Sequence, residues 1–139
     1  MLTLSAAGVK IAKIMSAGKV LVVDDEPEVR LVLTEFLESR GYEVVAAGSG
    51  AQALAIVDEV KPHVVLLDVT MPEMDGMETL KRLAALKPGL PIIMVTANAD
   101  VDVTSKLLAL GAADYIPKPF DLDYLGQAVS IQVSASLEP

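Results

Sequence analysis

Charged and hydroxyl side chains follow the most apolar segments of this sequence, at the points where those segments end. The run Val-Val-Leu-Leu ends in Asp68, and the run Val-Leu-Val-Val ends in Asp24 and Asp25. Two later apolar runs lead to the hydroxyl of Thr96 and the ammonium of Lys118. Short runs of this kind are typical of strands buried on both faces of a parallel sheet. Alone, Asp68 is equally well explained as a turn residue, but four such endings together indicate one shared site.

Three carboxylates at one edge of a sheet would repel one another. Neighbouring parallel strands lie about 4.8 Å apart, so side chains at their ends share a pocket if the strands are adjacent. At an effective dielectric constant near 20, each charged pair 4–5 Å apart costs roughly 3–4 kcal/mol. We therefore predict a hard divalent cation, and Mg²⁺ is the natural candidate because it leaves positions open for water and phosphate oxygens. With Thr96 and Lys118 the set matches the needs of phosphoryl transfer, and Asp68 is the best-placed nucleophile.

The composition is that of one ordinary globular domain. The 139 residues suffice for a real core, and the apolar fraction of 53% and charged fraction of 22% argue against disorder. The net charge of −8 argues against direct binding of nucleic acid and suits binding of cations. Because the chain has no cysteine, disulfides, thiol catalysis and Cys-based zinc sites are excluded. No apolar run reaches the about 18 residues of a transmembrane helix, so we expect a cytoplasmic protein without a membrane partner.

Strand-like and helix-like segments alternate along the chain and must bring these groups together. We predict buried strands at residues 19–23, 42–46, 64–68, 92–95 and 113–116. Helical spacing follows each strand, with helices that begin near Pro27, Ser49, Gly76, Val101 and Asp121. This alternation predicts an α/β doubly wound parallel sheet of five strands with five helices and right-handed crossovers.

Residues 19–134 form the predicted domain. Residues 1–18 stand apart and are expected to form an N-terminal extension or tail. A signal peptide is not expected, because the lysines of this segment lie among its apolar residues and not before them. A membrane-surface or partner-binding helix is the alternative for this segment. Residues 135–139 carry no strong signal and are expected to form a C-terminal tail.

Four motifs of this sequence resemble one known family. They are Val22-Val23-Asp24-Asp25, Leu67 to Pro72 with Met74-Asp75-Gly76, Val95-Thr96-Ala97, and Tyr115 to Phe120. Together they are similar to the receiver domain of bacterial two-component response regulators, over roughly residues 19–134. The resemblance implies a flavodoxin-like (CheY-like) sheet with strand order 2-1-3-4-5. It also implies a signalling protein that is no enzyme beyond catalysing its own aspartyl phosphorylation and dephosphorylation.

The resemblance assigns roles to the residues at the predicted site. Asp68 is the implied phosphoacceptor. Mg²⁺ would be held by Asp25, Asp68 and the backbone carbonyl of Thr70, with Asp24 acting close by through water. Lys118 would pair first with the acceptor carboxylate and then with the phosphoryl group. The peptide bond that follows Lys118 precedes a proline and is expected to be cis.

The resemblance also implies a switch. Thr96 would bond a phosphoryl oxygen, and Tyr115 would turn inward as Thr96 is drawn to the phosphate. Thr70 and Asn98 match two variable positions that tune the rate of dephosphorylation, in a direction that the residues leave open.

Partners follow from the same resemblance. The phosphoryl donor would be a sensor histidine kinase or a histidine phosphotransfer protein. The downstream effector would meet the face formed by the helix at 101–110, the strand at 113–116 and the final helix, and a phosphorylation-dependent dimer is compatible with that face. The sequence leaves open whether the chain is a stand-alone regulator or a receiver cut from a transcription factor or a hybrid kinase.

Three rival interpretations make different demands on the sequence. An interaction module that keeps the fold without phosphorylation would not need the intact set of acids, threonine and lysine. A flavin-binding flavodoxin needs a hydroxyl- and glycine-rich phosphate loop where Asp24, Asp25 and Glu26 stand. A dehalogenase-type phosphatase needs a second Asp two residues after the nucleophile, where this chain has Thr70.

Other conspicuous residues have simpler explanations. His63, the only histidine, precedes Asp68 by five residues of strand, roughly 16 Å, so we expect it at the opposite edge of the sheet. The methionines between residues 71 and 77 are expected to fill packing gaps. Glu26 is expected to be a solvated charge in the first turn of a helix.

Overall fold

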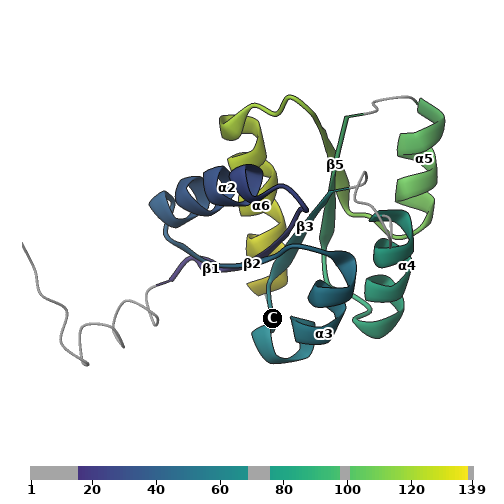
Figure 1. The fold of residues 1–139 in the computed structure, drawn as a ribbon, viewed down its shortest axis with the longest axis horizontal. Helices are drawn as coiled ribbons and strands as arrows, with labels where there is room; N and C mark the ends of the chain where they lie inside the picture. Colours follow the sequence, from purple (N-terminus) through teal and green to yellow (C-terminus); the bar gives the residue numbers. More distant parts are fainter. Residues whose placement is uncertain (1–15, 69–75, 98–100, 138–139) are drawn as a thin grey trace, which may run out of the picture.

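The computed structural model describes residues 16–68, 76–97 and 101–137 (Figure 1). Within these ranges, strands and helices alternate along the chain as predicted. The strands are β1 (Gly18–Val23), β2 (Tyr42–Ala47), β3 (Val64–Asp68), β4 (Ile92–Thr96) and β5 (Asp114–Pro117). The helices are α2 (Pro27–Ser39), α3 (Gly50–Val60), α4 (Gly76–Leu86), α5 (Val101–Ala109) and α6 (Leu122–Leu137). None of these helices is long and apolar enough to cross a membrane.

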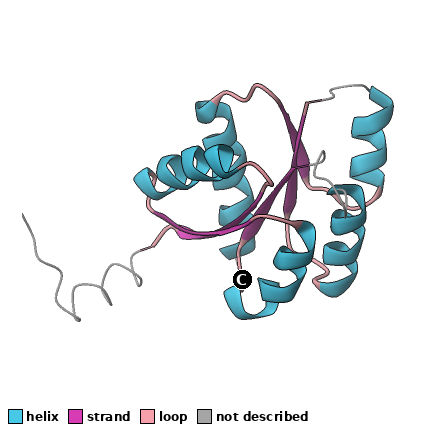
Figure 2. Ribbon diagram, viewed as in Figure 1, coloured by secondary structure: helices cyan, strands magenta, loops and turns pink. Residues whose placement is uncertain are grey.

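The strands form one parallel sheet in the order β2-β1-β3-β4-β5, with β3 at its centre. The predicted fold class and strand order are therefore confirmed. Helices α2 and α6 cover one face of the sheet, and α3, α4 and α5 cover the other (Figure 2). Every residue of β3 and β4 is buried, because both faces of these strands are covered, and this explains their uninterrupted apolar sequences.

Each face of the sheet has its own hydrophobic core. Successive side chains of a strand point to opposite faces, so Leu21 and Leu67 pack on one side while Val22 and Leu66 pack on the other. The helices that cover the Val22 side contribute Leu33, Leu37, Leu125, Val129 and Val133. Those that cover the Leu21 side contribute Ala53, Val57, Leu80, Leu83 and Leu107. The two cores hold the sheet between two helical layers and leave its ends for polar side chains.

Short polar signals set the helix ends. Ser49 caps α3 by accepting a hydrogen bond from the Gln52 N–H at 3.1 Å. Asp121 caps α6 by accepting one from the Asp123 N–H at 2.8 Å. After α2, Gly41 has a φ of +93°, a conformation that glycine adopts readily and that ends the helix. The beginnings of α3 and α6, at Ser49 and Asp121, are where the sequence predicts them.

Helix α6 differs most from its prediction, because it continues to Leu137, past the last residue with a helical signal. Val133 of α6 is 3% exposed and packs in the core between α2, α6 and the sheet. This burial stabilises the last turns of α6, although their serines are weak helix formers. Strands β2, β4 and β5 also end one residue later than predicted, and pairing of Thr96 with Pro117 extends the last ladder. The domain limits of 19 and 134 stay a prediction.

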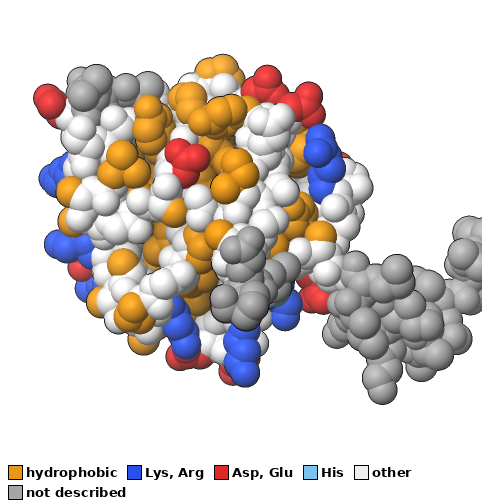
Figure 3. Space-filling view, turned by 180° about the vertical axis from the view of Figure 1, so that it is seen from behind, with side chains coloured by type: hydrophobic (Ala, Val, Ile, Leu, Met, Phe, Trp, Pro, Cys, Tyr) orange, Lys and Arg blue, Asp and Glu red, His pale blue; other side chains and the backbone are white. Residues whose placement is uncertain are grey.

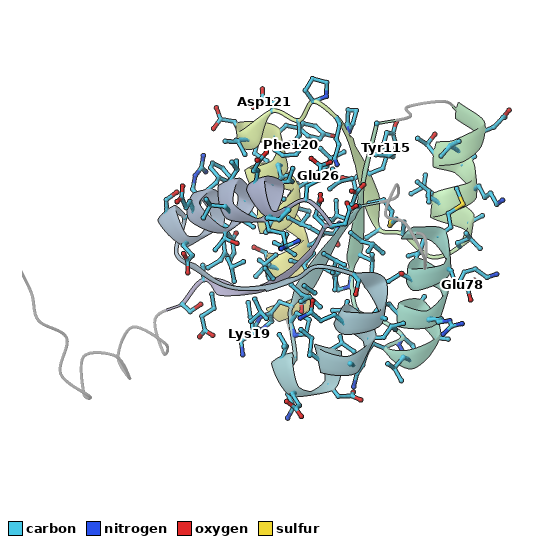
Figure 4. All side chains as sticks on the ribbon, viewed as in Figure 1. Lys19, Glu26, Glu78, Tyr115, Phe120 and Asp121 are labelled. Carbon is cyan, nitrogen blue, oxygen red and sulfur yellow. The ribbon has the colours of Figure 1, made fainter. Side chains whose placement is uncertain are left out.

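His63 lies just before β3, at the end opposite to Asp68, as predicted. The ring Nδ1 of His63 accepts a hydrogen bond from the backbone N–H of Lys19 at 2.9 Å, and the backbone N–H of His63 donates to the Lys19 carbonyl at 2.8 Å. Figure 4 shows Lys19 at the lower edge of the sheet and Glu26 at the upper edge. His63 therefore ties β1 to β3 at the edge that lies away from the carboxylates.

Candidate functional site

The side chains predicted from the strand ends meet at the carboxyl edge of the sheet. Asp24 directly follows β1, Asp68 ends β3, and Lys118 directly follows β5. Val23 pairs with Leu67, so Asp24 and Asp68 come from neighbouring positions of adjacent strands. Because the strands are parallel, all three polar side chains lie at the same edge, where sheets of this class bind ligands.

Lys118 joins the two buried carboxylates. Its Nζ lies 3.3 Å from Asp68 Oδ2 and 3.6 Å from Asp24 Oδ2. Asp68 is 1% exposed and Asp24 is 2% exposed, whereas the Lys118 side chain keeps 18% of its surface in contact with solvent. One ammonium therefore serves two carboxylates, and the site keeps an excess of negative charge.

Burial and the neighbouring charges shift the pKa values of Asp24 and Lys118. Burial raises the pKa of the Asp24 carboxyl, and the charge of Asp68 adds to the rise, although a hydrogen bond from the Glu26 N–H and the charge of Lys118 oppose it. For Lys118, burial alone would lower the pKa, but the charges of Asp68 and Asp24 outweigh burial and raise the pKa of the ammonium. The lysine is thus held in its charged form, while the environment of Asp24 disfavours its charged form.

A third carboxylate, Asp25, joins this pair. Asp24, Asp25 and Asp68 each offer one oxygen, and these oxygens lie within 4.8 Å of one another. Charges at that separation repel by about 3 to 4 kcal/mol per pair at an effective dielectric constant near 20, less where solvent screens the exposed Asp25. Carboxylate oxygens are the ligands that Mg²⁺ prefers, so these residues fit a divalent cation of that kind. Thr70, the other predicted ligand, lies outside the described residues.

Thr96 and Tyr115 lie on one face of the sheet. Met94 pairs with Tyr115 across β4 and β5, and Thr96 follows Met94 by two residues, so all three belong to the face covered by α3, α4 and α5. Thr96 is fully buried and Tyr115 is half-buried. The Lys118 N–H donates to the Thr96 carbonyl at 2.7 Å, and the Lys118–Pro119 bond is cis, as predicted.

Other predicted residues fall elsewhere. Asn98 lies outside the described residues, as do two of the three methionines between residues 71 and 77, whereas Met77 packs against the core as predicted. Glu26 is exposed, but it is the residue before α2 and not part of its first turn. Its backbone N–H donates to Asp24 Oδ1 at 2.9 Å, so Glu26 contacts the site through its main chain.

Arg30 contacts the site but is absent from the sequence prediction. Its Nη1 donates a hydrogen bond to the backbone carbonyl of Asp24 at 2.7 Å, which links α2 to the end of β1. The side chains of a helix lean toward its amino end, and the amino end of α2 follows the acid pair almost directly. An arginine near the start of a helix that follows the acid pair is therefore the sequence signal from which this contact could have been predicted.

This fold and this arrangement of side chains occur together in a known family. The family model for the response regulator receiver domain matches residues 20–130, which is most of the chain. The chain therefore belongs to the receiver domains of response regulators, a family of signalling proteins. The resemblance that the four motifs carry is confirmed.

Individual relatives and solved structures agree with this assignment. Sporulation initiation phosphotransferase F of Bacillus subtilis is 40% identical over 115 residues, which cover 83% of this chain and 93% of that protein. The receiver domain of the Francisella response regulator 1452 superposes with a TM-score of 0.82 at 29% identity, over 86% of this chain and 98% of that one. The chemotaxis protein CheY4 of Vibrio cholerae gives a TM-score of 0.78 at 32% identity, over 84% of this chain and 98% of that one.

Other relatives are much longer than this chain. The regulatory protein AtoC of Escherichia coli is 41% identical over 112 residues, which cover 81% of this chain and 24% of that protein. The DNA-binding transcriptional regulator NtrC of the same species is 40% identical over 78% of this chain and 23% of that protein. The chain thus spans about a quarter of the length of these two relatives.

Proposed function

We propose that this receiver is a phosphorylation-driven switch in which Asp68 accepts a phosphoryl group in a Mg²⁺-dependent reaction. The observation that carries the proposal is the position of the Lys118 ammonium, 3.3 Å from Asp68 Oδ2 at an edge shared with two further carboxylates. A lysine beside a buried carboxylate is suited to orient the nucleophilic acceptor and then to meet the charge of an incoming phosphoryl group.

The proposed reaction uses groups of this chain in distinct roles. A carboxylate oxygen of Asp68 attacks the phosphorus of a phosphohistidine donor, the phosphorus–nitrogen bond breaks as the phosphorus–oxygen bond forms, and the leaving imidazole takes up a proton. Lys118 and the Thr96 hydroxyl contact the transferred phosphoryl oxygens. Asp25, Asp68 and the Thr70 carbonyl would hold Mg²⁺, with Asp24 acting through water. When bound, this cation supplies neutralising charge for the phosphoryl oxygens.

The shared face of Thr96 and Tyr115 supports the proposed switch. A hydroxyl that moves toward a phosphoryl group on Asp68 leaves room on the face that it shares with the half-buried Tyr115 ring. The ring then turns inward, which changes the outer surface of β5. Thr70 and Asn98 are the proposed positions that tune how long the phosphorylated state lasts.

Two surfaces support the proposed partners. The donor, a sensor histidine kinase or a histidine phosphotransfer protein, would approach the carboxyl edge beside α2, where Leu31 and Val32 are 58% and 46% exposed. The effector would meet the face of α5, β5 and α6, where a hollow of about 420 Å³ adjoins Tyr115 and the half-exposed Tyr124. In the view from behind, apolar side chains gather over the middle of the molecule and most Lys and Arg lie toward its margins (Figure 3).

The hollow on this face is lined by apolar and aromatic side chains with Asp121, and by no lysine or arginine. Such a face suits a protein effector or a second copy of the chain and not direct contact with nucleic acid. We propose further that the phosphorylated chain can dimerise, that it makes no direct contact with DNA or a membrane, and that it acts in the cytoplasm. The only catalysis proposed is that of the chain's own phosphorylation and dephosphorylation.

The proposal is tested by incubating the whole chain with acetyl phosphate and Mg²⁺ and separating the products on a Phos-tag gel. We expect a shifted band for the native chain. We expect only the unshifted band for Asp68→Ala, and only the unshifted band for the native chain when Mg²⁺ is chelated. Asp58→Ala is the matched control, because that aspartate is exposed near the end of α3 and pairs with Lys87. It should be labelled like the native chain.

Labelling of Asp68→Ala at the native level would refute the assigned acceptor. Absence of label in the native chain, with a folded protein and a cognate histidine kinase also tested, would favour an interaction module that works without phosphorylation.

A further inference from the structure

Three hydrogen bonds hold Asp24 at the end of β1. Its N–H donates to the Ala47 carbonyl at 3.1 Å, which continues the pairing of β1 with β2. Its Oδ1 accepts from the Glu26 N–H at 2.9 Å. Its backbone carbonyl accepts from Arg30 Nη1 at 2.7 Å, and this is the only one of the three that a side chain of α2 supplies. The Asp24 carbonyl belongs to the peptide group that leads into Asp25, so its direction sets the plane from which the exposed Asp25 carboxylate projects.

The guanidinium of Arg30 also lies against the turn that follows β2. A Cβ atom built on Gly48 would come 3.3 Å from Arg30 Nη1 and 3.6 Å from its Cζ. The half-buried arginine thus spans the ends of two neighbouring strands from its place on α2. Its own backbone N–H is bonded to the Glu26 carbonyl at 3.1 Å, so the start of the side chain is anchored in regular helix.

Arg30 contacts the site through a backbone carbonyl and not through an ion pair. Within the described ranges, no ion pair joins its guanidinium to a carboxylate. A charge-assisted bond of 2.7 Å to a carbonyl is short and directional, and the planar guanidinium keeps its orientation better than an ammonium would. A bond of this type fixes the peptide group without neutralising the acids beside it.

We infer that Arg30 is a positioning residue, whose bond to the Asp24 carbonyl orients the Asp24–Asp25 pair for a divalent cation. This inference rests on the proposed function, because it concerns the same cation site. Replacing a residue that hydrogen-bonds to a metal-ligating residue typically lowers the metal affinity about 10- to 100-fold.

The sign of the effect separates positioning from charge. If Arg30 acted on the site through its positive charge alone, its removal would tighten the binding of a cation, because like charges repel. If it positions the acid pair, its removal weakens that binding. The two explanations therefore predict opposite changes in Mg²⁺ affinity.

The experiment is titration calorimetry of the whole chain with Mg²⁺, without a phosphoryl donor, together with melting curves in EDTA. We expect Arg30→Met to weaken Mg²⁺ binding about tenfold or more. Arg30→Lys, which keeps the charge but not the planar fork, should fall between Arg30→Met and the native chain. Arg40→Met is the matched control: Arg40 lies at the other end of the same helix, pairs with Asp123 at 3.1 Å and stacks on Phe36. It should bind Mg²⁺ as tightly as the native chain.

Native or tighter affinity in Arg30→Met would overturn the inference, as would a lower melting temperature in EDTA with unchanged affinity. Should Arg30→Met fail to fold, Arg30→Lys decides, and native affinity in that variant would overturn the positioning role. A native chain that binds no Mg²⁺ would refute the proposed function and this inference together. Binding by the native chain with no change in the Arg30 variants would refute this inference alone.

Discussion

Asp24 is a carboxylate that the fold keeps buried beside a lysine without fully stabilising its charge. It is 2% exposed, and burial is the main reason that its pKa is raised. A raised carboxyl pKa means that the folded state favours the protonated form. The resulting stability is fully present below the unfolded pKa of 3.8 and is lost as pH rises through the folded pKa. At neutral pH, the charged Asp24 therefore lowers the stability of the chain when no metal is bound.

Replacing this carboxylate should stabilise the metal-free chain in a pH-dependent way. We expect Asp24→Asn to raise the free energy of unfolding in EDTA near neutral pH, because the amide removes the buried charge while its oxygen can still accept from the Glu26 N–H. Lys118 keeps Asp68 as its partner. The gain should shrink as pH falls toward 3.8, the unfolded pKa, because the folded carboxyl has a raised pKa and is already mostly protonated there. Urea unfolding of both chains at the two pH values measures the difference. An equal difference at both would contradict the burial argument.

At the scale of elements, helices α3 and α4 approach each other closely at Gly50. A Cβ atom on Gly50 would overlap the hydroxyl of Thr79, which is fully buried on α4. The glycine therefore sets how closely the two helices approach.

Filling that contact should destabilise the fold. We expect Gly50→Ala to lower the free energy of unfolding by about 1 to 3 kcal/mol, the usual range for an overpacked contact. Thr79→Ala removes the atoms that clash most, so the double variant should recover most of the loss relative to Thr79→Ala alone. Denaturant melts of the four chains give the interaction energy. Additive losses would show that the two residues do not limit the approach of the helices.

His63 has a structural role at the opposite edge of the sheet. Its Nδ1 is the acceptor for the Lys19 N–H, and a Cβ on the adjacent Gly18 would lie 3.5 Å from that nitrogen. We expect His63→Ala to cost about 1 to 2 kcal/mol of stability, because the Lys19 N–H loses its partner. Phosphorylation by acetyl phosphate should be unchanged. A variant that is fully stable but no longer labelled would instead give His63 a part in the chemistry.

At the scale of the whole molecule, the position of the site could be predicted from the sequence, because the buried strands of a parallel sheet all end at the same edge. The run before Asp68 is too apolar to be exposed, so its carboxylate had to lie at a strand end, and the same holds for Asp24. The alternation of strands and helices predicts a parallel sheet but not which strands are neighbours. The order that puts Asp24 beside Asp68 came from the resemblance to receivers.

What the sequence could not show depends on contacts that form only when elements pack. The bond from Arg30 to the Asp24 carbonyl, and the overlap between Gly50 and Thr79, join side chains and backbone that no local pattern relates. The last turns of α6 are weak helix formers held by Val133 in the core, so propensity alone ends that helix too early.

Three carboxylates crowd beside one lysine, and we propose that Mg²⁺ makes this arrangement favourable. The most direct test of this proposal is the melting temperature of the native chain and of Asp25→Asn, each measured in EDTA and in Mg²⁺. Asp25 is exposed, so the substitution removes repulsion without opening a cavity. At a Mg²⁺ concentration near one hundred times its dissociation constant, the native chain should gain about 2.7 kcal/mol, several degrees in melting temperature.

In EDTA, Asp25→Asn should melt above the native chain, and Mg²⁺ should add little to it. Melting temperatures that are the same with and without Mg²⁺ in both chains would contradict the account.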